Sequence, residues 1–356
     1  GFVYDFNKFK KLIKNYKENE GELSYFKSLN PNDIKYKFIK GWYDIGSKET
    51  KENAEKFFSN TKSILPKYDQ GIFFKNNKVY KFFTNESIIK KRYERSKILK
   101  PHVPKLLKKT KYFYIYNFHN GIIFSKLKNK KKEFPKLLIW LNKIFWKKIT
   151  LDRIKLKNFE QRCNSFYYEK SLSRINYLYE KNNIYDQVEL INHIKTPKIS
   201  SMFEGINWRD INTGIPVNFH GDLHFENIIK NKNKIILLDW REDFSDIKNY
   251  GDIYYDLAKI NHGLIIDHSV IKKSKFNINV NKKNIKINFE QSQDNKDCQK
   301  IFFNFLEENN YSVRKVKILT SLIFLNIAGL HHYPYSIFLY YLGKFMLAKS
   351  LDDKIK

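Results

Sequence analysis

The stretch from Val217 to Asp239 constrains this chain more than any other part of its sequence. A short apolar segment enters a polar turn rich in His, Asp and Asn, and a second apolar run, Ile235–Leu238, ends on the carboxylate of Asp239. This pattern predicts a strand, a loop and a two-stranded ribbon. Such a ribbon would bring Asp222, Asn227 and Asp239 to one place.

These three side chains match the chemical needs of phosphoryl transfer. One Asp can accept the proton of an attacking hydroxyl, while an Asn and a second Asp can hold a divalent cation. In-line transfer from ATP requires a positioned nucleophile and metal ions that neutralise charge on the phosphate oxygens. The stretch therefore indicates a phosphoryl-transfer site.

A zinc site is the competing interpretation of the same loop, because His220 and His224 are four residues apart. Zinc pairs at this spacing lie on a helix and usually belong to a His-Glu-x-x-His motif. Here Gly221 follows a predicted strand, which disfavours a helix. We therefore interpret His220 as a structural residue whose ring fixes the loop backbone.

The residues before this loop predict a β-rich segment with one helix, which is the composition of a kinase small lobe. The expected elements are a hairpin of strands 71–75 and 78–83, a helix over 85–99, and two further strands at 111–117 and 121–125 about an Asn-Gly turn. A strand lysine in such a lobe reaches the nucleotide phosphates and is oriented by a glutamate on the helix.

Lys81 is the first candidate for that lysine, because it lies in a Val-Tyr-Lys strand. Glu94 is its expected partner on the helix, and Glu86 is the second choice. Lysine is abundant throughout this chain, so an exposed strand position is the alternative for Lys81. No glycine-rich phosphate loop precedes it, and only Gly71 and an Asn-Asn turn are available for a nucleotide lid.

The rest of the chain predicts a larger and mainly helical part. Residues 126–133 form a basic connector, and apolar residues at helical spacing follow from 134 to 182. A hairpin is expected at 276–289 and apolar helices at 297–351. Trp208–Asp210 precede the central loop and would lie either at a substrate entrance or in a surface turn.

The central motif, His-Gly-Asp-x-x-x-x-Asn followed by Ile-Leu-Leu-Asp-Trp, resembles the aminoglycoside phosphotransferase and choline kinase family. The resemblance covers roughly residues 68–350 and includes Gly251–Ala258, which matches a Gly-Asp-x-x-x-Asp-Leu-Ala helix start. It implies an α+β, protein-kinase-like two-lobe fold, with a small lobe at 68–128 and a large lobe at 129–356. The sequence after Asp239 contains neither the activation segment of protein kinases nor their Ala-Pro-Glu element, which favours a small-molecule substrate.

The resemblance also implies roles for individual residues and a dependence on ATP and Mg²⁺. Asp222 matches the catalytic base, Asn227 and Asp239 match the two Mg²⁺ ligands, and Lys81 and Glu94 match the nucleotide-binding lysine and its helix partner.

Two features near this motif are interpreted separately. Arg241 stands where many members of the family have Glu, which leaves the roles of the acidic residues that follow it open. Asp252 and Asp256 are expected to be a helix cap and a buried structural partner rather than catalysts.

The first 58 residues resemble the C-terminal end of a sugar nucleotidyltransferase. The Trp-Tyr-Asp-Ile-Gly turn at 42–46 and the opening strand at 1–6 carry this resemblance, which implies that Asp44 helps to hold Mg²⁺. The alternative is a simple turn residue beside Gly46. We expect 1–58 to be a short α/β remnant that follows a catalytic half, with a linker ending near Pro66.

The amino-acid composition limits which kinds of binding partner are expected. The net charge of +30 comes mainly from Lys spread along the chain, which favours a solvated surface over a specific nucleic-acid site. Weak attraction to an anionic membrane is the intermediate option. Cys163 and Cys298 form no metal or disulfide pattern and are expected to be buried, which suits a cytoplasmic location.

The acceptor hydroxyl belongs, on these grounds, to a sugar or a choline-like molecule. A nucleotidyltransferase segment ahead of a kinase suggests consecutive steps that supply a surface-polysaccharide precursor. A choline site would need an aromatic cage with carboxylates. Aminoglycosides are disfavoured because the chain is strongly basic. An inactive kinase-like scaffold or a polyanion-binding protein is the alternative function.

Overall fold

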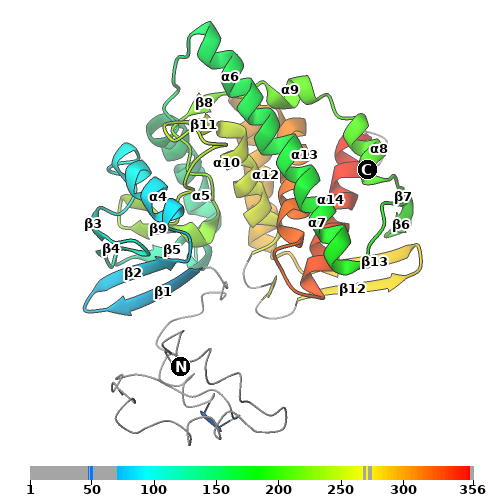
Figure 1. Cartoon of the computed structure of the whole chain (residues 1–356), viewed down its shortest axis with the longest axis horizontal. Coiled ribbons are helices and arrows are strands. Elements are labelled where there is room, and N and C mark those ends of the chain that lie inside the picture. Colours follow the sequence, from blue (N-terminus) through cyan, green and yellow to red (C-terminus); the bar gives the residue numbers. More distant parts are fainter. Residues whose placement is uncertain (1–46, 48, 51–69, 268–269, 272–274, 353–356) are drawn as a thin grey trace, which may run out of the picture. The chain divides into compact units, whose positions relative to one another are not determined.

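The computed structural model describes residues 47, 49–50, 70–267, 270–271 and 275–352. Within this part, a β-rich small lobe is followed along the chain by a larger helical lobe, as Figure 1 shows. The predicted α+β two-lobe fold class is confirmed. Contacts divide the chain into Gly1–Ile64 and Leu65–Lys356. Almost all of the expected nucleotidyltransferase remnant, residues 1–58 with Asp44, lies outside the described residues.

The small lobe is a four-stranded antiparallel sheet with one helix. Its strands are ordered β1-β2-β4-β3, and each neighbouring pair is antiparallel. The elements are β1 (Gln70–Lys75), β2 (Lys78–Phe83), α4 (Glu86–Ile98), β3 (Leu106–Lys109) and β4 (Phe113–Asn117).

Local sequence explains the best-predicted part of this lobe. Asn76 and Asn77 join β1 to β2 with φ of 48° and 54°, the left-handed region that asparagine tolerates in tight hairpins. Asn85 begins α4 as its N-cap, because its side chain accepts a hydrogen bond from the Ser87 N–H at 2.9 Å. The predicted hairpin and helix are both confirmed.

Of the next two predicted strands, 111–117 is confirmed as β4, whereas 121–125 differs from the structure. The segment 121–125 does not pair with the strand before it. Only Ile122–Ile123 (β5) is extended, and it pairs with β9 (Ile228–Asn231) beside the central loop. Gly121 permits this, because a Cβ at its position would meet the side chain of Ile229 and the backbone of Lys230. Strand β3 was not anticipated.

The large lobe is built from helices that pack around α10 (Ile253–Ile265). Nearly all of α10 is buried, and it lies against α13 (Val313–Ala328), which in turn packs along α14 (Tyr335–Leu351). Most residues of helix α14 are buried, as expected for a helix in the interior. Further helical segments are η2 (Phe124–Lys126), α5 (Lys130–Trp140), η3 (Leu141–Phe145), α6 (Arg153–Asn164), η4 (Ser165–Glu169), α7 (Lys170–Asn182), α8 (Ile199–Glu204), α9 (Trp208–Asn212), η5 (Phe225–Asn227) and α12 (Gln293–Glu308). Helix α5 begins inside the expected connector, residues 126–133.

Short strands hold the central loop in place. β8 (Pro216–Val217) pairs with β11 (Gly251–Asp252), which leads directly into α10. After the loop, β9 pairs with β10 (Lys234–Leu237), so the predicted ribbon is confirmed. The strand before the loop is shorter than the sequence indicates.

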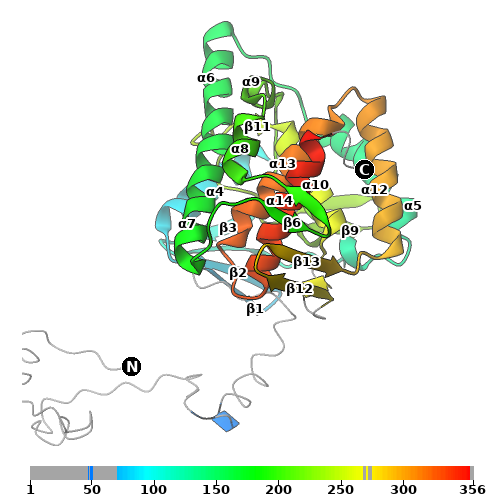
Figure 2. The ribbon, with the colours of Figure 1, turned by 90° about the vertical axis from the view of Figure 1, so that its right-hand side faces the viewer.

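The predicted hairpin near residue 280 is also confirmed. β12 (Phe276–Asn281) and β13 (Asn284–Phe289) join β6 (Glu189–Ile191) and β7 (Ile194–Thr196) in a sheet ordered β12-β13-β6-β7. The hairpin packs against α14, through rings such as Phe338, and Figure 2 shows its place beside that helix.

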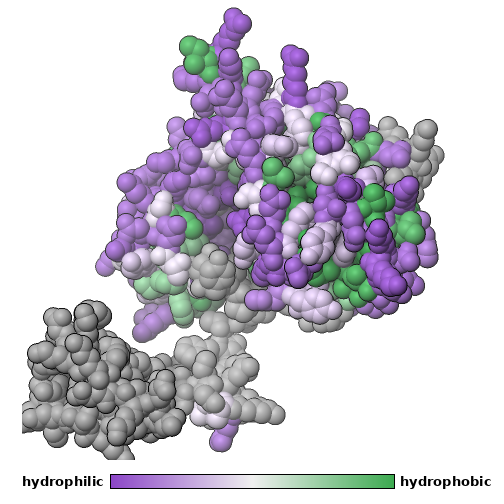
Figure 3. All heavy atoms as spheres, turned by 45° about the vertical axis from the view of Figure 1, so that its right-hand side comes forward, coloured by the Kyte–Doolittle hydropathy of each residue, from purple (hydrophilic) through white to green (hydrophobic). Residues whose placement is uncertain are grey.

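The surface is mainly hydrophilic on the face drawn in Figure 3, where hydrophobic residues form small scattered groups. Among the described residues, no helix combines the length and the apolar character needed to span a membrane. Cys163 and Cys298 are both free and buried, as predicted.

Candidate active site

The loop between β8 and β9 is held in shape by Asp256 of α10. The backbone N–H groups of His220 and Gly221 donate to the two oxygens of Asp256 at 2.6 and 2.7 Å. Gly221 has a φ of +87°, which favours glycine. The N–H of Asp222 donates to Nδ1 of His220 at 3.2 Å, so the His220 ring fixes the loop backbone as predicted. The Asp222 side chain is thereby set at a defined point of the loop.

Asp256 and Asp252 are structural, which confirms that prediction. Asp256 also accepts from the indole N–H of Trp146 at 3.0 Å. Burial raises the pKa of Asp256 to about 6, although its three N–H donors favour the ionised form. Asp252 is the N-cap of α10 and accepts from the hydroxyl of Tyr167 at 2.8 Å.

The carboxylate of Asp222 is surrounded by donors and is 35% exposed. Lys259 Nζ lies 2.7 Å from Oδ1, and His224 Nε2 lies 3.6 Å from Oδ2. The amide nitrogen of Asn227 donates to Oδ2 at 3.3 Å. Desolvation raises the pKa of Asp222, but Lys259 and His224 outweigh it and hold the pKa well below 3.8. Asp222 is therefore an ionised acceptor at neutral pH.

Lys259 is a site residue that the sequence analysis missed. It lies on α10 only three residues after Asp256, and it is 7% exposed. Desolvation lowers its pKa, but Asp222 outweighs this and the pKa is raised overall. A single lysine inside the apolar run Leu257–Ile260 was the available signal, because a buried lysine needs a carboxylate partner.

Asn227 is tied to Asp222 through its amide nitrogen. Nδ2 donates to the backbone oxygen of Asp222 at 2.9 Å and contacts Nε2 of His224 at 3.1 Å. These contacts leave the carbonyl oxygen Oδ1 as the atom that Asn227 can offer to a cation. The N–H of Leu238 donates to the Asn227 backbone oxygen at 2.7 Å, which brings the next residue, Asp239, beside this position.

Asp239 meets Lys81 of strand β2. Oδ1 of Asp239 forms an ion pair with Lys81 Nζ, and Lys81 is buried, at 1% exposure. The alternative of an exposed strand lysine is therefore wrong for Lys81. Asp239 has a φ of +59°, so its backbone adopts an uncommon conformation at the point where the ribbon ends.

The donor set fits a hard cation. Asn227 and Asp239 offer an amide oxygen and carboxylate oxygens, which suit Mg²⁺. Among the described residues, no group of three or more His, Cys, Asp or Glu side chains gathers as a metal site. A Mg²⁺ ion held by one or two protein side chains keeps water and substrate phosphate oxygens as its other ligands.

The structure does not bring Glu94 to Lys81. Glu94 pairs instead with Lys248 at 2.6 Å, and this lysine lowers the pKa of Glu94. The second choice, Glu86, lies 3.4 Å from Lys111 on the exposed surface. Both glutamates lie away from the face of α4 that is turned to the site.

That face of α4 presents arginines. Arg92 Nη1 lies 3.8 Å from Oδ1 of Asp239, and Arg92 Nε lies 3.5 Å from Oε2 of Glu242. The indole N–H of Trp240 donates to the Arg92 backbone oxygen at 2.9 Å. A cation therefore occupies the helix face where the sequence predicted a glutamate.

Arg95 follows Arg92 by three residues on α4, and it connects the small lobe to the central loop. It is fully buried and donates to the backbone oxygens of Arg241 at 2.7 Å and Phe219 at 2.5 Å. Its guanidinium lies 4.2 Å from the centre of the Phe219 ring. Burial lowers the pKa of Arg95 to about 9. This arginine fixes the backbone on both sides of the site.

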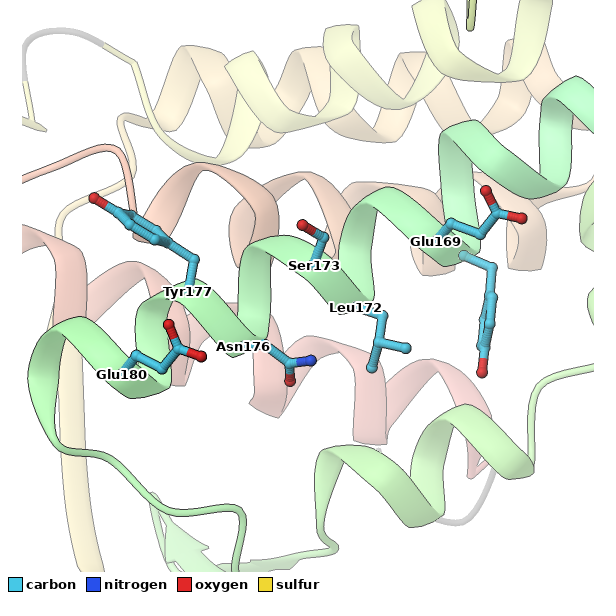
Figure 4. Close-up of a pocket in the computed structure, with 7 residues that line it drawn as sticks. Glu169, Leu172, Ser173, Asn176, Tyr177 and Glu180 are labelled. Carbon is cyan, nitrogen blue, oxygen red and sulfur yellow. The ribbon is translucent and has the colours of Figure 1, made fainter.

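Trp208 lies on α9, and its neighbour Tyr168 lines a surface groove. Its indole N–H donates to the Phe203 backbone oxygen at 2.8 Å, and its ring packs on Tyr168 at 4.9 Å. A groove of about 550 Å³ lies along η4 and α7 and is lined in part by Tyr168. Figure 4 shows the labelled side chains of its lining on these helical segments. Its lining contains Glu169, Leu172, Ser173, Asn176, Tyr177 and Glu180 and none of the predicted site residues.

No protein-family model and no curated protein matches the chain. Among solved structures, an ethanolamine kinase of Plasmodium vivax is similar over 96% of this chain and 96% of that chain, at 15% identity and a TM-score of 0.42. The streptomycin–ATP complex of APH(2")-IIa is similar over 87% of this chain and 99% of that chain, at 14% identity and a TM-score of 0.43. A choline kinase of Cryptosporidium parvum is similar over 82% of this chain and 90% of that chain, at 12% identity and a TM-score of 0.42. At these values the comparisons assign neither a substrate nor a site residue to this chain.

Proposed function

We propose that this protein is an ATP- and Mg²⁺-dependent phosphotransferase that phosphorylates a hydroxyl group of a small molecule. The observation that carries the proposal is a single connected set of contacts. Lys81 pairs with Asp239, the ribbon joins Asp239 to Asn227, and Asn227 bonds to Asp222. A phosphate-binding cation, two oxygen ligands and an ionised acceptor are the parts that such a transfer needs.

In the proposed reaction, Asp222 orients the acceptor hydroxyl. The acceptor oxygen forms a bond to the γ-phosphorus of ATP while the bond from that phosphorus to the β–γ bridging oxygen breaks, and ADP leaves. The hydroxyl proton passes to the Asp222 carboxylate. Because the pKa of Asp222 is held low by Lys259 and His224, this carboxylate is a weak base, and its main contribution is to align the hydroxyl.

Lys81, Asn227 and Asp239 would hold the nucleotide end. Mg²⁺ bound by Asn227 Oδ1 and an Asp239 oxygen would supply charge neutralisation at the phosphate oxygens. Lys81 is already buried beside Asp239, so its ammonium group stays at the position where the phosphates are expected. The predicted sugar or choline-like acceptor and the surface-polysaccharide role remain parts of the proposal.

The test is release of ADP by the purified chain with Mg²⁺-ATP and a panel of hydroxyl compounds. We expect Asp222→Ala to lower kcat by about 10²–10⁴-fold, in the range of a lost general base. Asp246→Asn is the matched control, because this acidic side chain is 72% exposed and its ion pairs within the described residues are with Lys91 on α4 and Arg162 on α6. Unchanged turnover in Asp222→Ala would remove the basis of the assignment.

One observation favours a second function, a kinase-like scaffold without catalysis. Arg92 occupies the helix face where a glutamate would orient Lys81, and Lys81 is paired directly with Asp239. Calorimetric titration with Mg²⁺ and a non-hydrolysable ATP analogue separates the two functions. Binding that is lost in Asp239→Asn supports the phosphotransferase, and absence of binding supports the scaffold.

A further inference from the structure

A second group of cations lies beside Asp222 and takes no part in the nucleotide site described above. Lys170 Nζ lies 4.0 Å from the centre of the Phe166 ring and 5.7 Å from the centre of the Tyr255 ring. The Arg241 guanidinium lies 4.9 Å from the same Phe166 ring. Two positive charges therefore share one aromatic ring. Arg174 follows Lys170 by four residues on α7, so it projects from the same helix face.

This group adjoins the proposed reaction centre. The Arg241 side chain contacts the position of Gly221, where its Cδ lies 3.1 Å from a Cβ built on that glycine, and Asp222 is the next residue. Tyr255 is on α10, one turn before Lys259, which binds Asp222. The Phe166 and Tyr255 rings touch edge to face at 4.7 Å. The rings and their cations thus border the side chain that would orient the acceptor hydroxyl.

The charges of this group are poorly balanced by the protein. Within the described part of the chain, neither Lys170 nor Arg174 forms an ion pair or a side-chain hydrogen bond, and Arg241 has only a contact of 3.9 Å to Glu242. Burial, followed by Arg241 and Arg174, lowers the pKa of Lys170 well below its usual value. Clustered, partly buried cations repel one another, and a bound anion would relieve that repulsion.

We propose that the acceptor carries an anionic group, a phosphate or a carboxylate, and that Lys170, Arg174 and Arg241 bind this group while Asp222 orients the hydroxyl. The inference rests on the proposed phosphotransferase function and narrows its acceptor class. It disfavours choline and aminoglycosides, because a cationic acceptor would meet like charge. The Phe166 ring, which could otherwise face a quaternary ammonium, is already in contact with two protein cations.

The first experiment measures binding, so it does not depend on knowing the acceptor. Inorganic phosphate and acetate are titrated into the chain with and without saturating Mg²⁺ and a non-hydrolysable ATP analogue. We expect at least one anion to bind whether or not the analogue is present, and to bind at least tenfold more weakly to Lys170→Gln. Phosphate binding alone or acetate binding alone would identify which anionic group is accepted.

The control is Lys143→Gln, which makes the same change of charge at an exposed lysine on η3. It should bind the anion as the wild type does. Equal weakening in both variants would mean a general charge effect and would overturn the proposal. So would the absence of anion binding, or displacement of the anion by the ATP analogue, which would assign these cations to the nucleotide phosphates.

The second experiment measures turnover with acceptors that share one sugar ring: glucose, glucose 6-phosphate and glucuronate, with choline as the cationic comparison. We expect kcat/KM to be at least tenfold higher for an anionic member than for glucose or choline. In Lys170→Gln the KM for that acceptor should rise tenfold while the KM for ATP is unchanged. Faster turnover of choline or glucose would contradict the inference while leaving the phosphotransferase function intact, whereas failure of the ATP analogue to bind would remove that function itself.

Discussion

At the residue scale, the site depends on buried charges whose partners come from distant parts of the chain. Lys259 is the clearest case, because it lies 2.7 Å from Asp222 and belongs to a helix that otherwise forms the core. Lys259 holds the Asp222 carboxylate, but it belongs to none of the motifs identified in the sequence. In the proposed reaction, Lys259 would fix the orientation of Asp222 and keep its carboxylate ionised.

We expect Lys259→Met to lower kcat by about 10- to 100-fold, because misplacement of a catalytic group by about 1 Å has effects of this size. The KM for ATP should stay unchanged, since Lys259 contacts Asp222 and not the Lys81–Asp239 pair. Steady-state kinetics of the variant and of Lys143→Met, an exposed control, provide the measurement. An altered KM for ATP with normal kcat would place Lys259 in the nucleotide site instead.

Two buried aspartates, Asp252 at the N-cap of α10 and Asp256 within α10, allow a matched comparison of their effects on stability. Both oxygens of Asp256 accept from N–H donors, so an asparagine there must turn its NH₂ group toward a donor. Asp252 accepts from the Tyr167 hydroxyl, which can reverse its role and accept from an asparagine. We expect Asp256→Asn to lower the free energy of unfolding by about 2–4 kcal/mol and Asp252→Asn to lower it by about 1 kcal/mol. Urea unfolding followed by circular dichroism measures both, and equal losses would contradict the donor geometry.

His220 gives a prediction about pH. Burial lowers its pKa from 6.5 to about 3, so the folded chain binds fewer protons than the unfolded chain between these values. The stability that neutral His220 contributes is therefore complete above about pH 6.5 and is lost as the pH falls toward 3. Between these two pKa values, His220 contributes about 1.4 kcal/mol per pH unit to the slope of the free energy of unfolding against pH.

His220→Asn should remove that share of the slope, because an asparagine oxygen can still accept from the Asp222 N–H but does not titrate. The measurement is the free energy of unfolding from pH 4 to pH 7 for both proteins, compared as slopes rather than as absolute values. Parallel curves would show that His220 is not the group responsible.

At the scale of elements, α4 connects the two lobes through its arginines. Its bounds were predictable, because Asn85 is an N-cap and apolar residues recur at helical spacing after it. The choice of which face turns inward was not predictable. Glu94 was selected by analogy with a helix glutamate, whereas the folded chain buries Arg95 and points Arg92 at Asp239. Backbone oxygens of the central loop require donors, and only the folded structure shows this requirement.

Arg95→Lys tests the connection. A lysine cannot donate in the fixed fork that reaches both the Phe219 and Arg241 backbone oxygens, so one buried oxygen loses its partner. We expect a loss of about 1–3 kcal/mol in the free energy of unfolding and a lower kcat. Lys97→Met is the control on the same helix, because Lys97 is exposed and lies over the Tyr93 ring. Equal effects of both changes would mean that the helix is only generally sensitive.

The strands show a second limit of sequence analysis. The β1–β2 hairpin and the β9–β10 ribbon have local turn signals, and both were predicted correctly. The pairing of β5 with β9 joins residues more than a hundred positions apart, and it depends on close approach at Gly121. An Asn-Gly turn favours a local hairpin, but this long-range contact prevails. Periodicity alone contains no information about such pairings.

At the scale of the whole molecule, the sequence determined the fold class because its motifs and its alternation of β-rich and helical segments agree. Composition was less informative about the site. A net charge of +30 spread along the chain hid the fact that a few cations, such as Lys170 and Arg241, gather at one ring beside Asp222. Lys81, Asp239 and Asn227 come from both lobes, so a nucleotide bound there would contact both.

Ligand binding should therefore stabilise the whole described fold rather than one lobe. With Mg²⁺ and a non-hydrolysable ATP analogue at about 100 times its Kd, the free energy of unfolding should rise by about 2.7 kcal/mol. Removal of the metal with EDTA should abolish most of this gain, because Asn227 and Asp239 offer only oxygen ligands to the cation.

Thermal unfolding with and without EDTA is compared for the wild type, Asp239→Asn and the exposed control Asp246→Asn. The gain should be absent in Asp239→Asn at either condition and normal in the control, because Asp239 contacts Lys81 whereas Asp246 is 72% exposed. A gain that survives EDTA unchanged would show that the analogue binds without the metal, and the assignment of Asn227 and Asp239 as cation ligands would be wrong.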